Sequence, residues 1–173
     1  ICLVFPKSTF LIDPLVYPPL GLWYLAAQLE AQGHHCDFRD LTNEPFPDDG
    51  EDYQVWVSAT SPQMHEVRKL NAAIQDWTKT HTAFGGAAPW ARPDLPGADN
   101  FDLVVAGESD HPTSVSTIVQ EAHFGFKHCK DKVPFAPAIT HGPLDWVLPH
   151  VRIWDEKYLA FLHDHNGISH CCT

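Results

Sequence analysis

Apolar residues recur with a helical period between two short apolar runs near the start of the chain. Four of them follow the i, i+3, i+4, i+7 spacing that places side chains on one face of a helix. They are Leu22, Leu25, Ala26 and Leu29. Pro18 and Pro19 come before this stretch, and proline is tolerated in a first helical turn. Gly33 follows it, where a left-handed cap favours a residue without Cβ. The pattern predicts a helix over residues 17–33 and indicates both of its ends.

Five short apolar runs predict strands, and each is bounded by turn-forming or polar residues. They cover residues 1–5, 35–41, 53–59, 81–84 and 101–106. Two further helical patterns follow the third and fifth runs. Their apolar positions are Val67, Leu70, Ile74 and Trp77, and then Val115, Ile118, Val119 and Ala122. Strands that alternate with helices predict an α/β fold with right-handed crossovers. We therefore expect a doubly wound, Rossmann-like five-stranded parallel sheet in the order 2-1-3-4-5, with a ligand crevice beside strands 1 and 3.

Loops and a change of pattern complete the predicted organisation. Residues 6–17 and the proline-rich residues 87–100 are expected to be loops, and the 6–17 loop, at the carboxyl end of the first strand, is a first candidate for a ligand site. Ser61 is expected to cap a helix that has Pro62 at its first position. After residue 125, prolines interrupt every longer apolar pattern. We expect a binding domain over residues 1–125 and an extended connector over residues 126–173. The two ends lack the features of natural termini, which indicates a piece of a longer protein.

Charge and composition narrow the class of partner. The 173 residues carry a formal net charge of −11, from 11 basic and 22 acidic residues, which argues against a nucleic-acid partner. No apolar run approaches the ~18 residues of a membrane span, and no leader pattern is visible, so we expect a cytoplasmic protein without a span. Cys2, Cys36 and Cys129 stand singly among five cysteines and are expected to be reduced thiols.

Three loops follow strands and are expected to meet at the carboxyl edge of the sheet: residues 58–63, 85–90 and 107–110. The paired glycines Gly85 and Gly86 would let a bulky ligand approach the backbone. Thr60 and Ser61 offer hydroxyls, and the adjacent helix start offers N–H groups for a phosphate. The cofactor-binding candidates are Ser58, Thr60, Ser61, Pro62, Gln63, Gly85, Gly86, Pro89, Gly107 and Glu108.

Each of these features also has a plain structural interpretation, since paired glycines form turns and Ser-Pro caps helices. Their common position at one sheet edge favours a ligand site. A dinucleotide fingerprint and a phosphate-binding P-loop are absent from the sequence. Residues 7–9 (Lys-Ser-Thr) offer only a faint likeness to a flavin phosphate loop.

Four segments follow one another along the chain: Pro18–Leu22 with Tyr24–Ala27, Ser58–Gln63, Gly85–Pro89 and Asp102–Glu108. In this order they resemble the N-terminal cobalamin-binding domain of B12-dependent radical SAM enzymes. The resemblance covers residues 1 to about 122 and continues more weakly from Pro143 to the end of the chain. It implies a Rossmann-like sheet with the corrinoid at its carboxyl edge, followed by a TIM-barrel-like radical SAM domain.

The resemblance also implies chemistry and further cofactors. Cobalamin would accept a methyl group from S-adenosylmethionine and pass it, as methylcobalamin, to a substrate carbon; some members of the family cyclise or rearrange their substrates. A [4Fe–4S] cluster would belong to the full-length protein, with Cys172, or less favourably Cys171, as its first ligand. The sequence departs from the family in having His170-Cys171 where an Arg-Gly pair usually precedes the first cluster cysteine.

Other interpretations stay open at this stage. The chain could be a non-catalytic corrinoid carrier or sensor module, or a flavodoxin-like electron carrier. Zinc is a further alternative for a polar cluster near the end of the chain. The cluster comprises His163, Asp164, His165, His170, Cys171 and Cys172. The Asp-x-His-x-x-Gly sequence that supplies a lower histidine ligand in many B12 domains is absent, and His65 is expected to be an exposed helix residue. We therefore expect no protein imidazole on cobalt.

Overall fold

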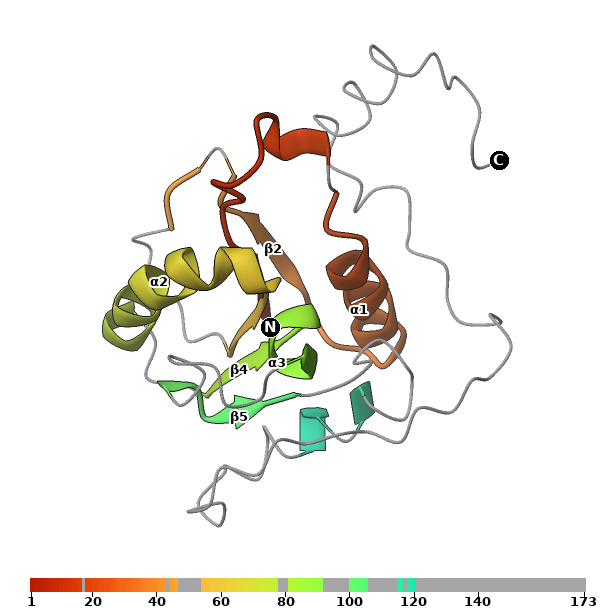
Figure 1. The fold of residues 1–173 in the computed structure, drawn as a ribbon. Helices are drawn as coiled ribbons and strands as arrows, with labels where there is room; N and C mark the ends of the chain where they lie inside the picture. The colour runs from red at the N-terminus through yellow and green to blue at the C-terminus, as the bar shows by residue number, and fades with distance from the viewer. Residues whose placement is uncertain are drawn as a thin grey trace, which may run out of the picture.

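A parallel sheet of five strands forms the centre of the chain (Figure 1). The computed structural model describes residues 1–16, 18–42, 44–46, 54–77, 81–91, 100–105, 115–116 and 118–120. The strands are β1 (Cys2–Phe5), β2 (Asp37–Asp40), β3 (Val55–Ser58), β4 (Thr82–Gly85) and β5 (Leu103–Val104). Their order is β2-β1-β3-β4-β5, and every neighbouring pair is parallel. The predicted α/β fold class and strand order are confirmed.

Helices cover both faces of the sheet, as the predicted doubly wound architecture requires. The α-helices are α1 (Leu20–Ala31), α2 (Met64–Trp77) and α3 (Ala87–Ala91). Two short 3₁₀ turns, η1 (Pro14–Val16) and η2 (Ser61–Gln63), lie in the loops. Figure 1 shows α1 and α2 on opposite sides of the strands. Within the described residues, no helix has the length and apolar character to cross a bilayer.

Side chains that alternate along the strands divide the core into two halves. Val4 and Val57 pack with α2, whereas Leu3 and Trp56 pack with α1. This alternation arises because successive residues of a strand point to opposite faces. The predicted apolar positions of both main helices are buried: Leu22, Leu25, Ala26 and Leu29 in α1, and Val67, Leu70 and Ile74 in α2. The Trp77 side chain and Ala122 lie outside what the structure describes.

The third predicted helix is confirmed over those of its residues that the structure describes. Residues 115–116 and 118–120 are helical, and Val115 and Ile118 are buried in the same half of the core as α1. Val119 is partly buried against that half. The connector predicted over residues 126–173, with its polar cluster, lies outside the described residues.

The C-terminus of α1 confirms the predicted glycine cap. Gly33 adopts φ +86°, the left-handed conformation that glycine accepts most readily. The His34 N–H donates to the Leu29 carbonyl at 3.0 Å, and the Gly33 N–H donates to the Glu30 carbonyl at 2.9 Å. These two bonds form a Schellman motif, which pairs carbonyls that the helix end would otherwise leave open.

Two local predictions are wrong. Thr60, with extended φ of −94°, is the N-cap of η2, so Ser61 is the first residue of that turn instead of its cap. The predicted loop over residues 87–100 begins with the helix α3. Pro89 is the third residue of α3, and in this first turn its missing N–H removes no helical hydrogen bond. The proline therefore does not prevent helix formation there.

Candidate functional site

The site lies where the chain leaves β1 and β3 toward opposite faces of the sheet. After β1 the chain passes through the 6–17 loop to α1, and after β3 it passes through η2 to α2. Because β1 and β3 are neighbours in the sheet, their carboxyl ends part at a topological switch point. Parallel α/β sheets bind ligands at such points. The predicted position of the crevice, beside strands 1 and 3, matches this arrangement.

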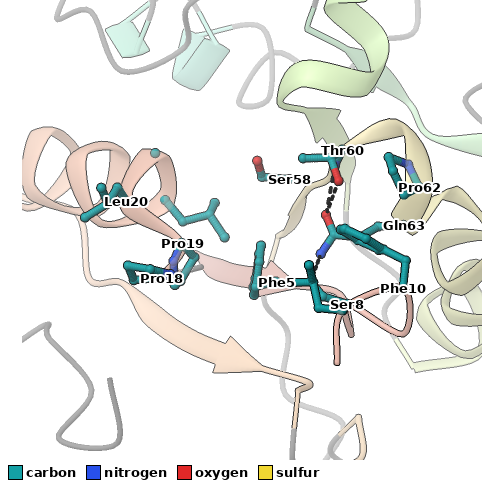
Figure 2. Close-up of a pocket in the computed structure, with 13 residues that line it drawn as sticks. Phe5, Ser8, Phe10, Pro18, Pro19, Leu20, Ser58, Thr60, Pro62 and Gln63 are labelled. Atoms are coloured by element: carbon teal, nitrogen blue, oxygen red, sulfur yellow. Dashed lines mark hydrogen bonds between the residues drawn. The ribbon is translucent and has the colours of Figure 1, made fainter. Parts of the chain in front are cut away.

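A cavity of about 520 Å³ opens at this switch point (Figure 2). This volume is in the usual range for small-molecule sites, roughly 300–1,000 Å³. Its wall combines the end of β1, the 6–17 loop, the start of α1, and the segment from the end of β3 through η2. The lining residues are Phe5, Ser8, Phe10, Leu11, Pro18, Pro19, Leu20, Gly21, Leu22, Ser58, Thr60, Pro62 and Gln63.

The wall is mostly apolar, and its opening carries large exposed side chains. Phe10 and Leu20 both line the cavity, and they are 50% and 45% exposed. They come from the 6–17 loop and from the first turn of α1. Exposed apolar side chains around an opening are typical of a binding surface that a ligand covers.

A buried amide joins the two loops that form the cavity. Gln63 is 1% exposed, and its Nε2 donates to the Pro6 carbonyl at 2.7 Å and to Ser8 Oγ at 2.9 Å. Its Oε1 accepts from the Thr60 N–H at 2.9 Å and from Thr60 Oγ1 at 3.0 Å. Figure 2 shows this amide between Ser8 and Thr60. Gln63 therefore fixes the loop after β1 against the loop after β3.

The predicted site residues separate into two groups. Ser58, Thr60, Pro62 and Gln63 line the cavity together. Four other candidates do not line the cavity: the exposed Ser61, Gly85, Gly86 and the buried Pro89. The remaining candidates, Gly107, Glu108, Cys171 and Cys172, lie outside the described residues.

Gly86 serves the packing of the sheet edge, and its predicted contact with a ligand stays a prediction. It adopts φ +96°, and a Cβ at this position would lie 2.7 Å from Ser58 Oγ and 2.8 Å from the Ala59 carbonyl oxygen. A side chain here would collide with the chain itself. Gly85 is less constrained, because its Cβ would lie 3.8 Å from the Val105 Cβ, an ordinary contact.

The expectation of unused N–H groups at the start of α2 also needs correction. The Gln63 N–H donates to the Thr60 carbonyl at 2.9 Å, and the Thr60 N–H donates to the Gln63 side chain. The Met64 N–H bonds to the Ser61 carbonyl, and Pro62 has no N–H. This segment therefore offers little to a phosphate through its backbone.

Sequence reasoning missed most of the α1 side of the cavity. The 6–17 loop was expected to contribute, but Phe5, Ser8, Phe10 and Leu11 carry no periodic pattern that selects them. The segment from Pro18 to Leu22 predicts a helix start and carries part of the resemblance to cobalamin-binding domains. Its position after the first strand was the signal that could have marked it as cavity wall.

The described titratable groups do not form a metal centre. No group of three or more His, Cys, Asp or Glu that could hold an ion occurs within the described ranges. His65 is exposed, as predicted, and is not a cavity residue. Cys2 and Cys36 are outside any disulfide. Burial raises the pKa of the Cys36 thiol from 9.0 to about 11, so this cysteine is a poor nucleophile at neutral pH.

A second, smaller hollow of about 260 Å³ lies beside α2. It contains Lys7 and Glu44 and the ion pair of Lys69 with Glu66, whose Nζ and Oε1 atoms are 3.1 Å apart. Of the described residues, four of the nine that line this hollow are charged, whereas no charged residue lines the cavity at the switch point. An apolar aromatic group would favour the larger cavity.

Comparison with protein families agrees with this geometry. A model of the B12 binding domain matches residues 14–115, which is more than half of the 173-residue chain. The match includes Pro18–Leu22 and Ser58–Gln63, which form two parts of the cavity wall. Searches of curated proteins and of solved structures returned no match. The chain therefore belongs to the B12-binding domain family, whose ligand is cobalamin.

Proposed function

We propose that the chain holds cobalamin by placing the nucleotide tail of the cofactor in the cavity at the switch point. The observation that carries this proposal is a 520 Å³ cavity at the carboxyl ends of β1 and β3 in a B12-binding domain. Its residues fit the tail chemically. Apolar side chains such as Phe5 and Leu22 suit a flat aromatic base, and the hydroxyls of Ser58 and Thr60 suit the polar ribose and phosphate.

The corrin ring is too large to share this cavity with the tail and would cover its opening. Phe10 and Leu20, both about half exposed, offer an apolar surface there. Gly107 and Glu108, which follow β5 in the sequence, remain candidates for contacts with the cofactor. Gly85 and Gly86 remain candidates as well, and Gly86 also packs against Ser58 and Ala59 and thereby positions the end of β3.

The enzyme that we propose for this domain is a B12-dependent radical SAM methyltransferase. Bound cobalamin supplies a cobalt centre that can accept a methyl group from S-adenosylmethionine and release it to a substrate carbon. The order of the four resembling segments supports this role, as does the position of Cys171 and Cys172 after the proline-rich stretch. Cys172 would be the first ligand of a [4Fe–4S] cluster in the full-length protein. We place the enzyme in the cytoplasm, and its substrate is a small molecule.

Cobalamin binding by the purified chain is tested by gel filtration after incubation with hydroxocobalamin. We expect about one equivalent of corrinoid to elute with the protein. Flavin mononucleotide, applied in the same way, should elute separately. Retention of the flavin and loss of the corrinoid would support the flavodoxin-like alternative and contradict the proposal.

The radical SAM role needs a separate test on the full-length gene product that contains this chain. Anaerobic reconstitution with iron and sulfide should produce a [4Fe–4S] cluster, and Cys172→Ala should abolish it. With the cluster present and the corrinoid reduced to Co(I) by an added low-potential reductant, labelled S-adenosylmethionine should transfer its methyl group to the protein-bound corrinoid and leave as S-adenosylhomocysteine. A full-length protein that binds cobalamin but never a cluster would instead be the carrier or sensor module.

A further inference from the structure

Two hydrogen-bond partners determine the orientation of the Gln63 amide, because one of them can only accept and the other can only donate. The Pro6 carbonyl can only accept, so the atom 2.7 Å from it is the nitrogen Nε2. The Thr60 N–H can only donate, so the atom 2.9 Å from it is the oxygen Oε1. Both requirements agree on one orientation, and the flipped amide would break both bonds.

This orientation determines the hydrogen-bonding roles of two hydroxyls that line the cavity. Ser8 Oγ accepts from Gln63 Nε2, and among the described residues it donates to no acceptor. Thr60 Oγ1 uses its hydrogen on Gln63 Oε1, which leaves it only lone pairs for a ligand. Ser8 is therefore the donor at the cavity wall and Thr60 an acceptor.

Ser8 is also the more buried of the two. It is 3% exposed, whereas Thr60 is exposed. A buried hydroxyl whose hydrogen finds no acceptor carries an energetic cost, and a ligand that supplies an acceptor removes that cost. The cavity therefore favours a ligand with an acceptor atom beside Ser8.

We propose that Ser8 recognises the nucleotide base of the corrinoid by donating its hydroxyl hydrogen to an unprotonated ring nitrogen of that base. This inference rests on the proposed function, which places the tail in the cavity. A benzimidazole that has left cobalt presents such a nitrogen. A phenolic base, which has no ring nitrogen, does not. The domain should therefore discriminate between corrinoids by their lower base.

The test compares three corrinoids by fluorescence-quenching titration of the purified chain. They are cobalamin, a cobamide with p-cresol as its lower group, and cobinamide, which lacks the nucleotide. The variants are Ser8→Ala, the conservative Ser8→Thr, and Thr9→Ala as a control at an exposed neighbouring hydroxyl. Circular dichroism verifies that each variant is folded.

Wild-type protein and Thr9→Ala should bind cobalamin about tenfold more tightly than the p-cresol cobamide, the order expected for one buried neutral hydrogen bond. Ser8→Ala should bind these two corrinoids with equal affinity, and Ser8→Thr should restore part of the preference. A preference that survives in folded Ser8→Ala, or that is absent from the wild type, overturns the role of Ser8.

Cobinamide separates this failure from failure of the proposed function. If the tail occupies the cavity, cobinamide should bind the wild type more weakly than either complete cobamide. Equal binding of all three corrinoids would show that the nucleotide tail does not occupy the cavity. If none of the three bound, cobalamin binding itself would be refuted.

Discussion

At the scale of single residues, Gly86 shows how a residue predicted as a ligand contact can also be a packing requirement. A Cβ there would lie under 3.0 Å from Ser58 Oγ and from two backbone atoms of Ala59. Paired glycines have the same appearance in a sequence whether they approach a ligand or their own chain. The positions of β3 and β4 reveal the packing role.

Gly86→Ala should therefore destabilise the protein by about 2–4 kcal/mol. A left-handed conformation costs a non-glycine residue ~1–2 kcal/mol, and displacing the end of β3 adds to this. Gly85→Ala is the matched control and should change the free energy of unfolding by less than about 1 kcal/mol, because its Cβ would lie 3.8 Å from the Val105 Cβ, an ordinary contact. Urea denaturation measures both. Equal effects of the two substitutions would contradict the assigned role of Gly86.

Cys36 makes the stability sensitive to alkaline pH. Its thiol has a pKa of about 11 in the folded protein, raised by burial from an ordinary value of 9.0. The unfolded state therefore releases this proton first, and the contribution of Cys36 to stability is lost as pH rises from 9 to 11. Below pH 9 that contribution is complete.

The measurement is the free energy of unfolding at several pH values for wild type and for Cys36→Ala. The difference between the two proteins should decrease between pH 9 and pH 11, since all other titrating groups are shared. A difference that stays constant over this interval would show that the thiol titrates normally in the folded state.

At the scale of elements, Gln63 connects the loop after β1 to the loop after β3 through four hydrogen bonds. Gln63→Leu should destabilise the protein by about 2–4 kcal/mol, because the Pro6 carbonyl and the Thr60 N–H lose their partner. Gln63→Glu should be intermediate, since a carboxylate still accepts from Thr60 but cannot donate to Pro6. Amide exchange by NMR should show faster exchange at Thr60 in Gln63→Leu.

Unchanged exchange at Thr60 in that variant would mean that the side chain of Gln63 does not hold the loop. The exchange rate of His34 serves as an internal control, because its N–H bonds to Leu29 at the opposite end of α1. It should be the same in all three proteins.

The helices and strands of this chain were largely predictable because their signals are local. The apolar spacing in α1 and α2 and the glycine after α1 each act within a few residues. Strand order followed from the crossover rules for parallel sheets. The short α3 was missed because Pro89 was interpreted as a loop signal, although a proline in the first turn is compatible with a helix.

The cavity was less predictable, because its parts are distant in sequence. Gln63 was a candidate through its place after β3, but its partners Pro6 and Ser8 are 57 and 55 residues away. No periodicity marks the 6–17 loop, whose side chains form much of the wall. The predicted loop over residues 107–110, which follows β5, lies outside the described residues, and its contribution stays a prediction.

At the scale of the whole molecule, the arrangement predicts the coordination of cobalt. His34, His35 and His81 precede β2 and β4 and lie at the amino edge of the sheet, away from the cavity. No described histidine lines the cavity. With the base of the cofactor in the cavity, cobalt would have neither this base nor a described imidazole as its lower ligand.

EPR of the Co(II) form tests this expectation. The spectrum should be that of base-off cobalamin, without the superhyperfine splitting that an axial nitrogen causes. Splitting from one nitrogen would show that the base, or a histidine, occupies the lower position. In that case cobalamin with ¹⁵N in the base would identify which of the two it is, and the proposed arrangement would be wrong.

In the proposed complex, the base of cobalamin lies in the cavity between the loops after β1 and β3. Isotope-filtered NOE spectroscopy detects these contacts, because a 19.4 kDa chain with bound diamagnetic cyanocobalamin is suitable for solution NMR. We predict NOEs from the benzimidazole protons to side chains of the cavity, Phe5 and Leu22 above all. NOEs to Leu41 and Phe46 of the smaller, charged hollow, or none to the protein, would contradict the account.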